Sequence, residues 1–379
     1  MSTTFQLGLG GLPAPAELYD AIQLLEVEEN ADRPDALLLR LPVNRTSSCD
    51  LQFVGDGLFE PYTNVTVVVT PDGQASQCIF DGYVLSWHLH LDRTSGSSTI
   101  EVWAQDASWL MSISDSVREW SGLTDGQVAN QIFSDPLYGF TPASGNTEDD
   151  SLPHDPSRHS LFQRSTDLQF LRGLARRNGK LCRVACTDTP GKRIGYFVTP
   201  AVEGKPVATI TLTDPAGWSV DSLEFDWDVM RPSEVDASQV ALDQASDSGV
   251  PGDSISSGLA ALDERDYETY ASQPATLLLT ATADVAELPL RTAATLRDAG
   301  WFVRCRGETN VDRLGSTLRV GSIVAIEGAG SLHSGNWFVW SVRHQITVDA
   351  VKLQFTLLRN AMGPAPSGGR PGPLSRDCS

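Results

Sequence analysis

Two blocks of strand-like sequence, far apart in the chain, constrain its fold most strongly. In the first block, residues 64–70 (NVTVVVT), 77–92 (QCIFDGYVLSWHLHLD) and 98–106 (STIEVWAQD) are rich in β-branched and aromatic residues. A Pro-Asp-Gly turn separates the first two segments, and a turn rich in Ser and Gly separates the last two. Short strands joined by turns at this spacing form antiparallel hairpins. The block therefore predicts a three-stranded β-meander.

The second block lies near the end of the chain and repeats this order. Residues 316–328, 335–349 and 351–360 again give a Val-rich strand, a long strand with an aromatic centre, and a closing strand with alternating side chains. Similar patterns at two places in one chain indicate an internal repeat, unless the similarity of pattern arose by chance. We interpret the blocks as two similar tube-like modules, each a small β-barrel or β-sandwich.

The sequence between the two blocks has a different character. Thr124 and Asp125 are typical of the start of a short helix, and Ser165 or Thr166 begins a second helix that ends at Asn178-Gly179. The second helix has one apolar face, and a β-hairpin follows it at 180–199. That apolar face comprises Leu168, Leu171, Leu174 and Ala175. This part of the chain is therefore predicted to be a small α+β insert.

The fold class predicted from these patterns is mainly β, with an α+β insert. The segment 16–30 is expected to begin as a short helix after Pro15 and to continue as a strand. Further strands are expected at 35–43, 208–214, 223–229 and 276–282, with a helix at 286–299. The predicted organisation is a first β module with an N-terminal arm at 1–115, the insert at 116–205, a second β module at 206–362 with a mobile loop at 244–262, and a disordered tail at 363–379.

Composition limits the kind of protein that this chain can be. Its 379 residues carry a formal net charge of −20, and 41% of them are hydrophobic. A strongly acidic surface does not favour the phosphates of nucleic acids, so no nucleic-acid specificity is expected. The acidic surface either keeps the protein soluble or lines a passage. We find no apolar run long enough to span a bilayer and no secretory signal, so synthesis and assembly are expected in the cytoplasm.

Several residues could carry chemistry, but each has a simpler interpretation. His88 and His90 lie two apart, on one face of a strand, which suits a metal site. We expect them instead on a solvent face, because Trp87, Leu89 and Leu91 on the other face need the core. His154, Asp155 and His159 lie in a polar loop, and the chain has no GxSxG nucleophile motif. The segment GLGGLP at 8–13 lacks the helix of a dinucleotide-binding loop, so a flexible N-terminal arm is expected.

Acidic pairs and cysteines are interpreted in the same way. The pairs Asp149/Asp150 and Asp226/Asp228 could serve glycoside hydrolysis, but solvated carboxylates are expected. The acidic face of the strand at 223–229 either lines a channel or faces water. Cys182 and Cys186 are expected to be small thiols in the core rather than zinc ligands. The N-glycosylation sequons at Asn44 and Asn64 would be modified only in a secreted protein, so no glycosylation is expected. We therefore predict no catalytic, cofactor-binding or metal-binding residues, no cofactor, and no enzymatic activity.

Four segments of the chain carry a resemblance to a known family. They are residues 25–42 (LEVEENADRPDALLLRLP), 79–84 (IFDGYV), 165–180 (STDLQFLRGLARRNGK), and 318–328 followed by 337–360. Their order resembles the hub family of contractile tails, which comprises phage late control protein D and the VgrG-like hubs of contractile injection systems. This chain departs from VgrG proteins because no OB-fold or β-helical spike follows its second block.

The resemblance implies a structural baseplate hub that forms a homotrimeric ring. Two similar modules per chain would give six around the ring, so a trimer could join a sixfold tail tube to a threefold spike. The implied partners are the tube protein, a separate spike protein and other baseplate proteins, within a tail or injection particle. The alternatives are a cell-wall-degrading or carbohydrate-binding tail-tip protein, and a ring protein that assembles as a hexamer. Nothing in the sequence separates a phage tail from a bacterial injection system.

Overall fold

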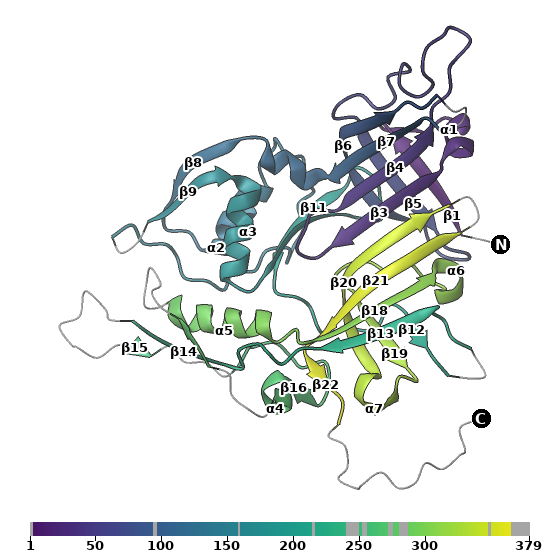
Figure 1. The fold of residues 1–379 in the computed structure, drawn as a ribbon. Helices are drawn as coiled ribbons and strands as arrows, with labels where there is room; N and C mark the ends of the chain where they lie inside the picture. Colours follow the sequence, from purple (N-terminus) through teal and green to yellow (C-terminus); the bar gives the residue numbers. More distant parts are fainter. Residues whose placement is uncertain are drawn as a thin grey trace, which may run out of the picture.

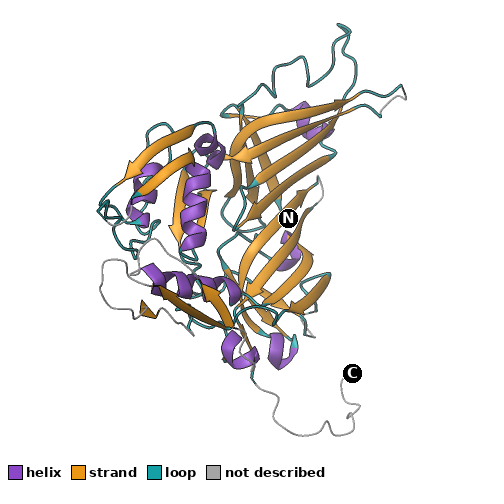
Figure 2. Ribbon diagram, turned by 60° about the vertical axis from the view of Figure 1, so that its left-hand side comes forward, coloured by secondary structure: helices purple, strands orange, loops and turns teal. Residues whose placement is uncertain are grey.

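A computed structural model describes most of the chain. The described residues are 3–93, 97–157, 160–213, 217–239, 250–251, 256–271, 276–279, 287–347 and 350–364. The architecture is mainly β, as predicted, and one large sheet of 13 strands dominates it (Figures 1 and 2). Its main path runs β13-β18-β21-β20-β3-β4-β7-β6-β5-β1-β2, with β19 beside β20 and β12 beside β19.

The first predicted meander is confirmed. β5 (Asn64–Thr70), β6 (Gln77–His90) and β7 (Thr99–Asp106) pair antiparallel in that order. β4 (Ala36–Pro42) continues the sheet from β7, and β3 (Leu24–Asn30) continues it from β4. In β3, β4 and β5 every second side chain is buried, as expected for strands with one face on a core.

The N-terminal segment is not a flexible arm, so that prediction was wrong. β1 (Thr4–Leu9) pairs with the full length of β5, and Gly10-Gly11 turns the chain into β2 (Leu12–Pro13). Both glycines have positive φ values, which a tight hairpin turn requires. Leu7 and Leu9 are buried, and the helix α1 (Ala16–Ala21) follows. Burial of this alternating pair stabilises the segment as a strand.

The second meander is also confirmed. β19 (Ile323–Glu327), β20 (Gly335–Ile346) and β21 (Val351–Arg359) pair antiparallel in that order. β18 (Val303–Asn310), which the sequence analysis missed, pairs with β21, and the predicted strand β13 (Ser222–Trp227) pairs with β18. β12 (Thr209–Thr211) lies parallel to β19.

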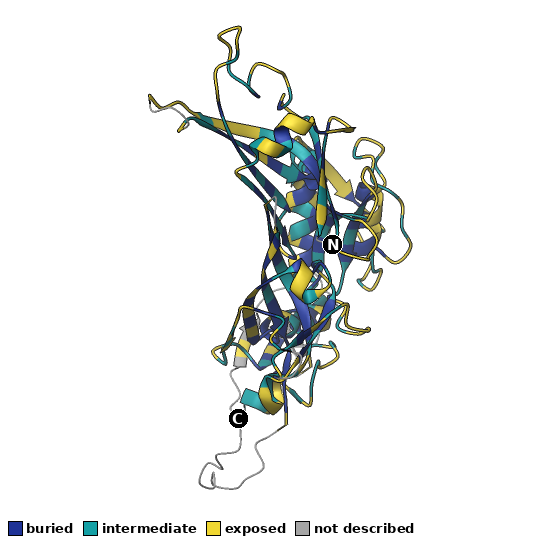
Figure 3. Cartoon of the chain, turned by 90° about the vertical axis from the view of Figure 1, so that its right-hand side faces the viewer, coloured by how far each residue is buried: buried dark blue, intermediate teal, exposed yellow. Residues whose placement is uncertain are grey.

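The two halves of the sheet are joined by backbone pairing between β3 and β20. β19 pairs with the first part of β20, up to Phe338, and β3 pairs with the part from Ser341 to Ile346. Buried residues of both halves, among them Val27, Leu39, Val342 and Leu353, form one hydrophobic core. The two halves are therefore parts of one continuous sheet, which curves along its length in the side view of Figure 3.

The insert has its own core beside the large sheet (Figure 1). Both predicted helices are present: α2 (Asp125–Phe133) begins at a capping box on Thr124, and α3 (Asp167–Arg177) is capped by Thr166. The predicted apolar face of α3 is buried. The other elements of this region are the 3-10 helix η1 (Ala107–Ser112), the pair β8 (Asp115–Trp120) and β9 (Leu161–Thr166), which was not predicted, and the hairpin β10 (Leu181–Cys186) and β11 (Arg193–Val198).

Shorter elements surround the second half of the sheet. The predicted helix α5 (Leu288–Ala299) packs against β14 (Glu234–Gln239), which pairs with β15 (Val250–Pro251) and β17 (Thr276–Leu279). The others are β16 (Arg265–Asp266), α4 (Tyr267–Ala271), α6 (Val311–Leu314), α7 (Gly330–His333) and β22 (Ala361–Met362). Most of the predicted mobile loop at 244–262 and nearly all of the predicted tail at 363–379 lie outside the described residues.

Candidate assembly surface

One polar face runs across eight neighbouring strands of the large sheet. The strand registers place its side chains in continuous rows from β13 through β18, β21, β20, β3, β4 and β7 to β6. None of these side chains is buried, whereas most of their neighbours on the other face belong to the core. The rows contain Glu224, Asp226, Arg304, Arg306, Glu308, Lys352, Gln354, Thr356, Ser341, Arg343, Gln345, Glu26, Glu28, Asn30, Leu38, Arg40, Glu101, Trp103, Ser86, His88 and His90.

Ion pairs cross from strand to strand on this polar face. Arg343 on β20 reaches Glu28 at 2.9 Å and Glu26 at 3.2 Å, both on β3. Arg306 on β18 lies 3.3 Å from Glu224 and 3.2 Å from Asp226, both on β13. Five basic and six acidic side chains balance one another here, although the whole chain carries a net charge of −20. The excess negative charge therefore lies elsewhere on the protein.

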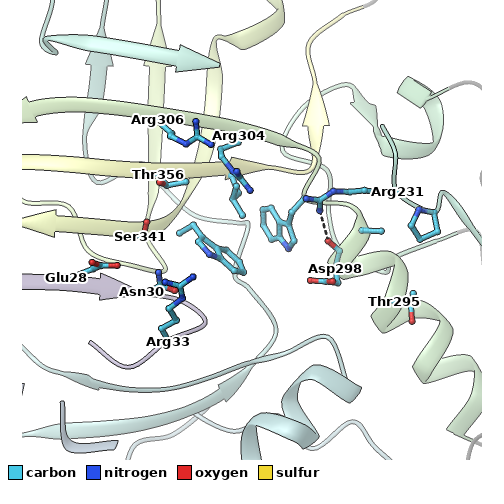
Figure 4. A pocket seen from close by; sticks show the side chains of 15 residues that line it. Glu28, Asn30, Arg33, Arg231, Thr295, Asp298, Arg304, Arg306, Ser341 and Thr356 are labelled. Atoms are coloured by element: carbon cyan, nitrogen blue, oxygen red, sulfur yellow. Dashed lines mark hydrogen bonds between the residues drawn. The ribbon is translucent and has the colours of Figure 1, made fainter. Parts of the chain in front are cut away.

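The polar face is hollowed over β3, β20, β21 and β18. One hollow of about 630 Å³ also reaches α5, and a second of about 470 Å³ lies over β13. Both are lined by Glu28, Arg306, Ser341 and Thr356, so they form one groove. Figure 4 shows the first hollow, whose lining includes the arginines Arg33, Arg231, Arg304 and Arg306.

A cluster of buried charges lies under the polar face, where the two meanders and the insert meet. Nε of Arg319, just before β19, lies 2.8 and 2.9 Å from the two carboxylate oxygens of Glu29 on β3. Arg183 of the insert lies 3.8 Å from Glu29 and 3.6 Å from Asp35. Burial would lower the pKa of Arg319, but Glu29 outweighs it and raises the pKa. The cluster therefore connects three parts of the chain.

His344 on β20 lies beside this cluster. It is fully buried, and its Nδ1 atom lies 4.0 Å from a carboxylate oxygen of Glu29. Burial lowers the pKa of His344 to about 4, and the positive charge of Arg319 acts in the same direction. The ring is consequently neutral at pH 7. His344 shares the core face of β20 with Val342 and Ile346, whereas Arg343 and Gln345 lie on the polar face.

The insert has a second buried charge cluster around Asp125. Its carboxylate accepts hydrogen bonds from His154 Nε2 (2.8 Å), Arg177 Nη2 (2.7 Å) and Asn178 Nδ2 (2.7 Å). Burial alone would raise the pKa of Asp125, but these partners outweigh it and lower the pKa to about 2. His154 was predicted to lie in a polar loop, but it is buried. The cluster ties the loop after α2 to the end of α3, which is a structural role.

The other candidate residues lie apart from one another. His88 and His90 are exposed, as expected, but Trp87 and Leu91 are also 46% and 57% exposed, so the expected core position of these two was wrong. The Asp149 carboxylate accepts hydrogen bonds from Thr124 and Gln127, and Asp150 pairs with Lys180. Both carboxylates are therefore engaged rather than freely solvated.

Asp226 and Asp228 are half-exposed, and each pairs with an arginine. Cys182 is buried, and burial raises the pKa of its thiol to about 12, whereas Cys186 is only partly buried. Asn64 donates to Asp81 and to the Gly82 carbonyl. His159 lies outside the described residues. Within the described ranges, no group of three His, Cys, Asp or Glu side chains could hold a metal ion, and no helix is long and apolar enough to cross a membrane.

No family model and no curated protein sequence matches this chain. Solved structures do match it across nearly its whole length. A tail protein from Neisseria meningitidis has a TM-score of 0.58 and 14% identity, over 95% of this chain and 97% of that chain. The 43 kDa tail protein of prophage MuSo2 from Shewanella oneidensis has a TM-score of 0.60 and 14% identity, over 95% of this chain and 100% of that chain.

Proteins of secretion systems match as well. A type VI secretion component of E. coli, described as similar to the T4 tail proteins gp27 and gp5, has a TM-score of 0.55 and 13% identity over 95% of this chain and 79% of that chain. A chain of the Francisella PdpA-VgrG complex has a TM-score of 0.58 and 11% identity, over 96% of this chain and 59% of that chain. The chain therefore has the fold that these phage tail proteins share with VgrG-type secretion proteins.

Proposed function

We propose that this protein is a structural baseplate hub of a contractile tail or injection system, and that three copies form a ring. The observation that carries the proposal is a matching set of strand pairings in the two halves of the sheet. The order β3-β4-β7-β6-β5 in the first half has the counterpart β13-β18-β21-β20-β19 in the second. All these pairings are antiparallel.

An irregularity at the same place in both halves supports this correspondence. The pairing of β6 with β7 shifts register between Val84 and Ser86, and the pairing of β20 with β21 shifts between Val339 and Ser341. Bulges re-aim the side chains that follow them and are specific features of a fold. Two modules at 1–115 and 206–362, separated by the insert at 116–205, account for both sets of pairings.

Two similar modules per chain would let a trimer present six similar units in a ring. Such a ring could match a sixfold tube on one side and a threefold spike on the other. The hollowed polar face would turn inward and line the channel, and its balanced charges would let a passing chain of either sign move through. The tube protein, a separate spike protein and other baseplate proteins would be the partners, and no catalysis is involved.

The mass of the protein in solution tests this proposal. We expect light scattering or native mass spectrometry to give three times the chain mass of 40.9 kDa, alone or after addition of a candidate spike protein. A hexamer would favour the alternative ring protein. A stable monomer that releases fragments from purified peptidoglycan would replace the hub proposal with the cell-wall-degrading alternative.

A further inference from the structure

Two strands of the large sheet have an unpaired edge. β5 pairs with β6 only up to Tyr83, so the second part of β6, from Ser86 to His90, pairs with β7 on one side alone. β13 pairs with β18 on one side. Among the described residues, no strand pairs with the other edge of either segment. An open edge of this kind is a template for pairing with another strand.

The strand β20, which corresponds to β6, has the same kind of edge, and inside the chain this edge is paired with β3. β20 corresponds to β6, because both are long central strands with a register shift before a serine. β19 leaves β20 at Phe338, as β5 leaves β6 at Tyr83. The edge of β20 that β19 leaves open is then filled by β3, whose counterpart in the second half is β13.

The correspondence can be followed residue by residue. Ser341 faces Thr356 on β21, as Ser86 faces Trp103 on β7, so Ser86 is the counterpart of Ser341. In the second half, Thr356 pairs with Arg306 on β18, which pairs with Glu224 on β13. In the first half, Trp103 pairs with Leu38 on β4, which pairs with Glu26 on β3. Glu224 is therefore the counterpart of Glu26. The local sequences agree with this alignment, since LEVE at 25–28 corresponds to LEFD at 223–226.

We infer that β6 of one copy pairs antiparallel with β13 of the next copy, in the register of β20 with β3. The inference rests on the trimeric ring proposed above, and it names the strands that close it. Within the chain, Val342 pairs with Glu29, Arg343 with Glu28 and His344 with Val27. Transferred to the open edges, this register sets Trp87 against Trp227, His88 against Asp226, Leu89 against Phe225, His90 against Glu224 and Leu91 against Leu223.

The exposure of apolar side chains supports this pairing. Val342 and Ile346 are both 0% exposed, because β3 lies beside them. Their counterparts Trp87 and Leu91 are 46% and 57% exposed, and Trp227 on the other open edge is 55% exposed. Large apolar side chains on two open sheet edges are typical of surfaces that a partner buries. Each copy has one edge of each kind, so the contact is head-to-tail and can close a ring.

Charge on the polar face agrees with the same register. Inside the chain, Arg343 of β20 forms ion pairs with Glu28 and Glu26 of β3. In the inferred contact, His88 and His90 would face Asp226 and Glu224, which correspond to those two glutamates. The two histidines that suggested a metal site in the sequence would therefore lie at the junction between subunits.

Engineered disulfides test the register. In the full chain carrying Cys49→Ser, which removes an exposed thiol, His88→Cys and Asp226→Cys would be introduced together. Residues directly opposed in an antiparallel pair have Cα atoms about 4.5–5.5 Å apart, which a disulfide can bridge. Under mild oxidation with glutathione disulfide, which accepts the two electrons and is reduced to glutathione, we expect a covalent trimer on a non-reducing gel.

Matched variants make the result specific. Glu28→Cys with Arg343→Cys, the same register inside one chain, should give an intrachain bond and stay monomeric on the gel. Either single variant of the His88/Asp226 pair should give no trimer band. A native trimer in which the His88/Asp226 pair does not crosslink, while the Glu28/Arg343 pair does, would overturn the strand pairing and leave the hub standing. Absence of any oligomer in solution would instead overturn the hub proposal, and this pairing with it.

A substitution at the edge gives an independent test. Trp87→Glu should reduce the mass in solution from that of a trimer to that of a monomer, because it places a charge against Trp227 of the next copy. Trp103→Glu is the control, since Trp103 is 45% exposed on the polar face, on the neighbouring strand, away from the open edge. A trimer that survives Trp87→Glu as well as Trp103→Glu would contradict the inferred contact. Circular dichroism should show both variants folded.

Discussion

Glu29 and Arg319 form a buried ion pair that joins the two halves of the sheet, although 290 positions separate them in the sequence. Glu29 is 0% exposed, and Arg319 also donates to the Cys78 carbonyl on β6 at 2.8 Å. Two residues from opposite ends of the chain thus meet where β3 pairs with β20. The ion pair therefore adds to the β3–β20 pairing and to the shared apolar core that join the halves.

Removing one member of this pair should destabilise the protein strongly. Arg319→Ala leaves the Glu29 carboxylate buried without its main partner, which should lower the free energy of unfolding by about 3–5 kcal/mol. Urea denaturation followed by circular dichroism measures the change. Arg343→Ala is the control, because its pairs with Glu26 and Glu28 are partly exposed to solvent and should contribute at most about 1 kcal/mol. Equal effects of the two variants would contradict the role of the buried pair.

His344 should make the protein less stable in mild acid. Burial lowers its pKa from 6.5 to about 4. Between these two pH values the histidine is protonated in the unfolded chain and neutral in the folded chain. Stability should therefore fall as the pH drops from about 6.5 towards 4, by at most about 3 kcal/mol from this group. His344→Leu should remove that part of the pH dependence, measured by urea titrations at several pH values. An unchanged slope in the variant would show that other groups control it.

Asp125 should make the stability of the protein depend on pH in a more acidic range than His344 does. Its folded pKa of about 2 lies below the usual value of 3.8, so its stabilisation is present above about pH 4 and is lost as the pH falls towards 2. Asp125→Asn removes the charge that Arg177 and His154 face, and it should loosen the insert by about 3 kcal/mol. Hydrogen exchange in α2 and α3 reports this change. The amides of β20 and β21 serve as the internal reference and should be less affected.

Two glycines should respond in opposite ways to a methyl group. At Gly82 on β6, an added Cβ would lie 2.1 Å from the carbonyl oxygen of Gln105, so Gly82→Ala should distort the pairing of β6 with β7 and lower the melting temperature. At Gly173 in α3, no atom beyond its chain neighbours and the backbone of its own helix lies within 4 Å of the added Cβ. Gly173→Ala should therefore stabilise the helix by roughly 0.5–1 kcal/mol. A loss of stability at both positions would contradict the packing described for α3.

Much of the local structure could be predicted because it depends on neighbours in the sequence. The alternation in β3, β4 and β5 shows which side chains need a core, and the cap at Thr166 with the Asn178-Gly179 stop delimits α3. β1 was missed because its glycines suggested flexibility, and only pairing with β5 stabilises it. β18 was missed because charged residues occupy every second position, which suits a strand whose outer face is polar.

The positions of buried polar groups depended on contacts between distant segments. His344 and His154 are buried, unlike the exposed His88. His344 lies on the core face of the large sheet, and His154 contacts Asp125 and Arg177 inside the insert. Conversely, Trp87 has the pattern of a core residue and is half-exposed, because no strand of the described chain pairs beside it.

The sequence by itself determined the mainly β class, both meanders, the insert with its two helices, and the resemblance to contractile-tail hubs, since periodicity, turns and caps are local. The tertiary structure decided that β20 pairs with β3, that one polar face crosses eight strands, and that β6 and β13 keep open edges. Which distant segments pair as strands depends on how the whole apolar core is buried, and a local sequence pattern does not specify it.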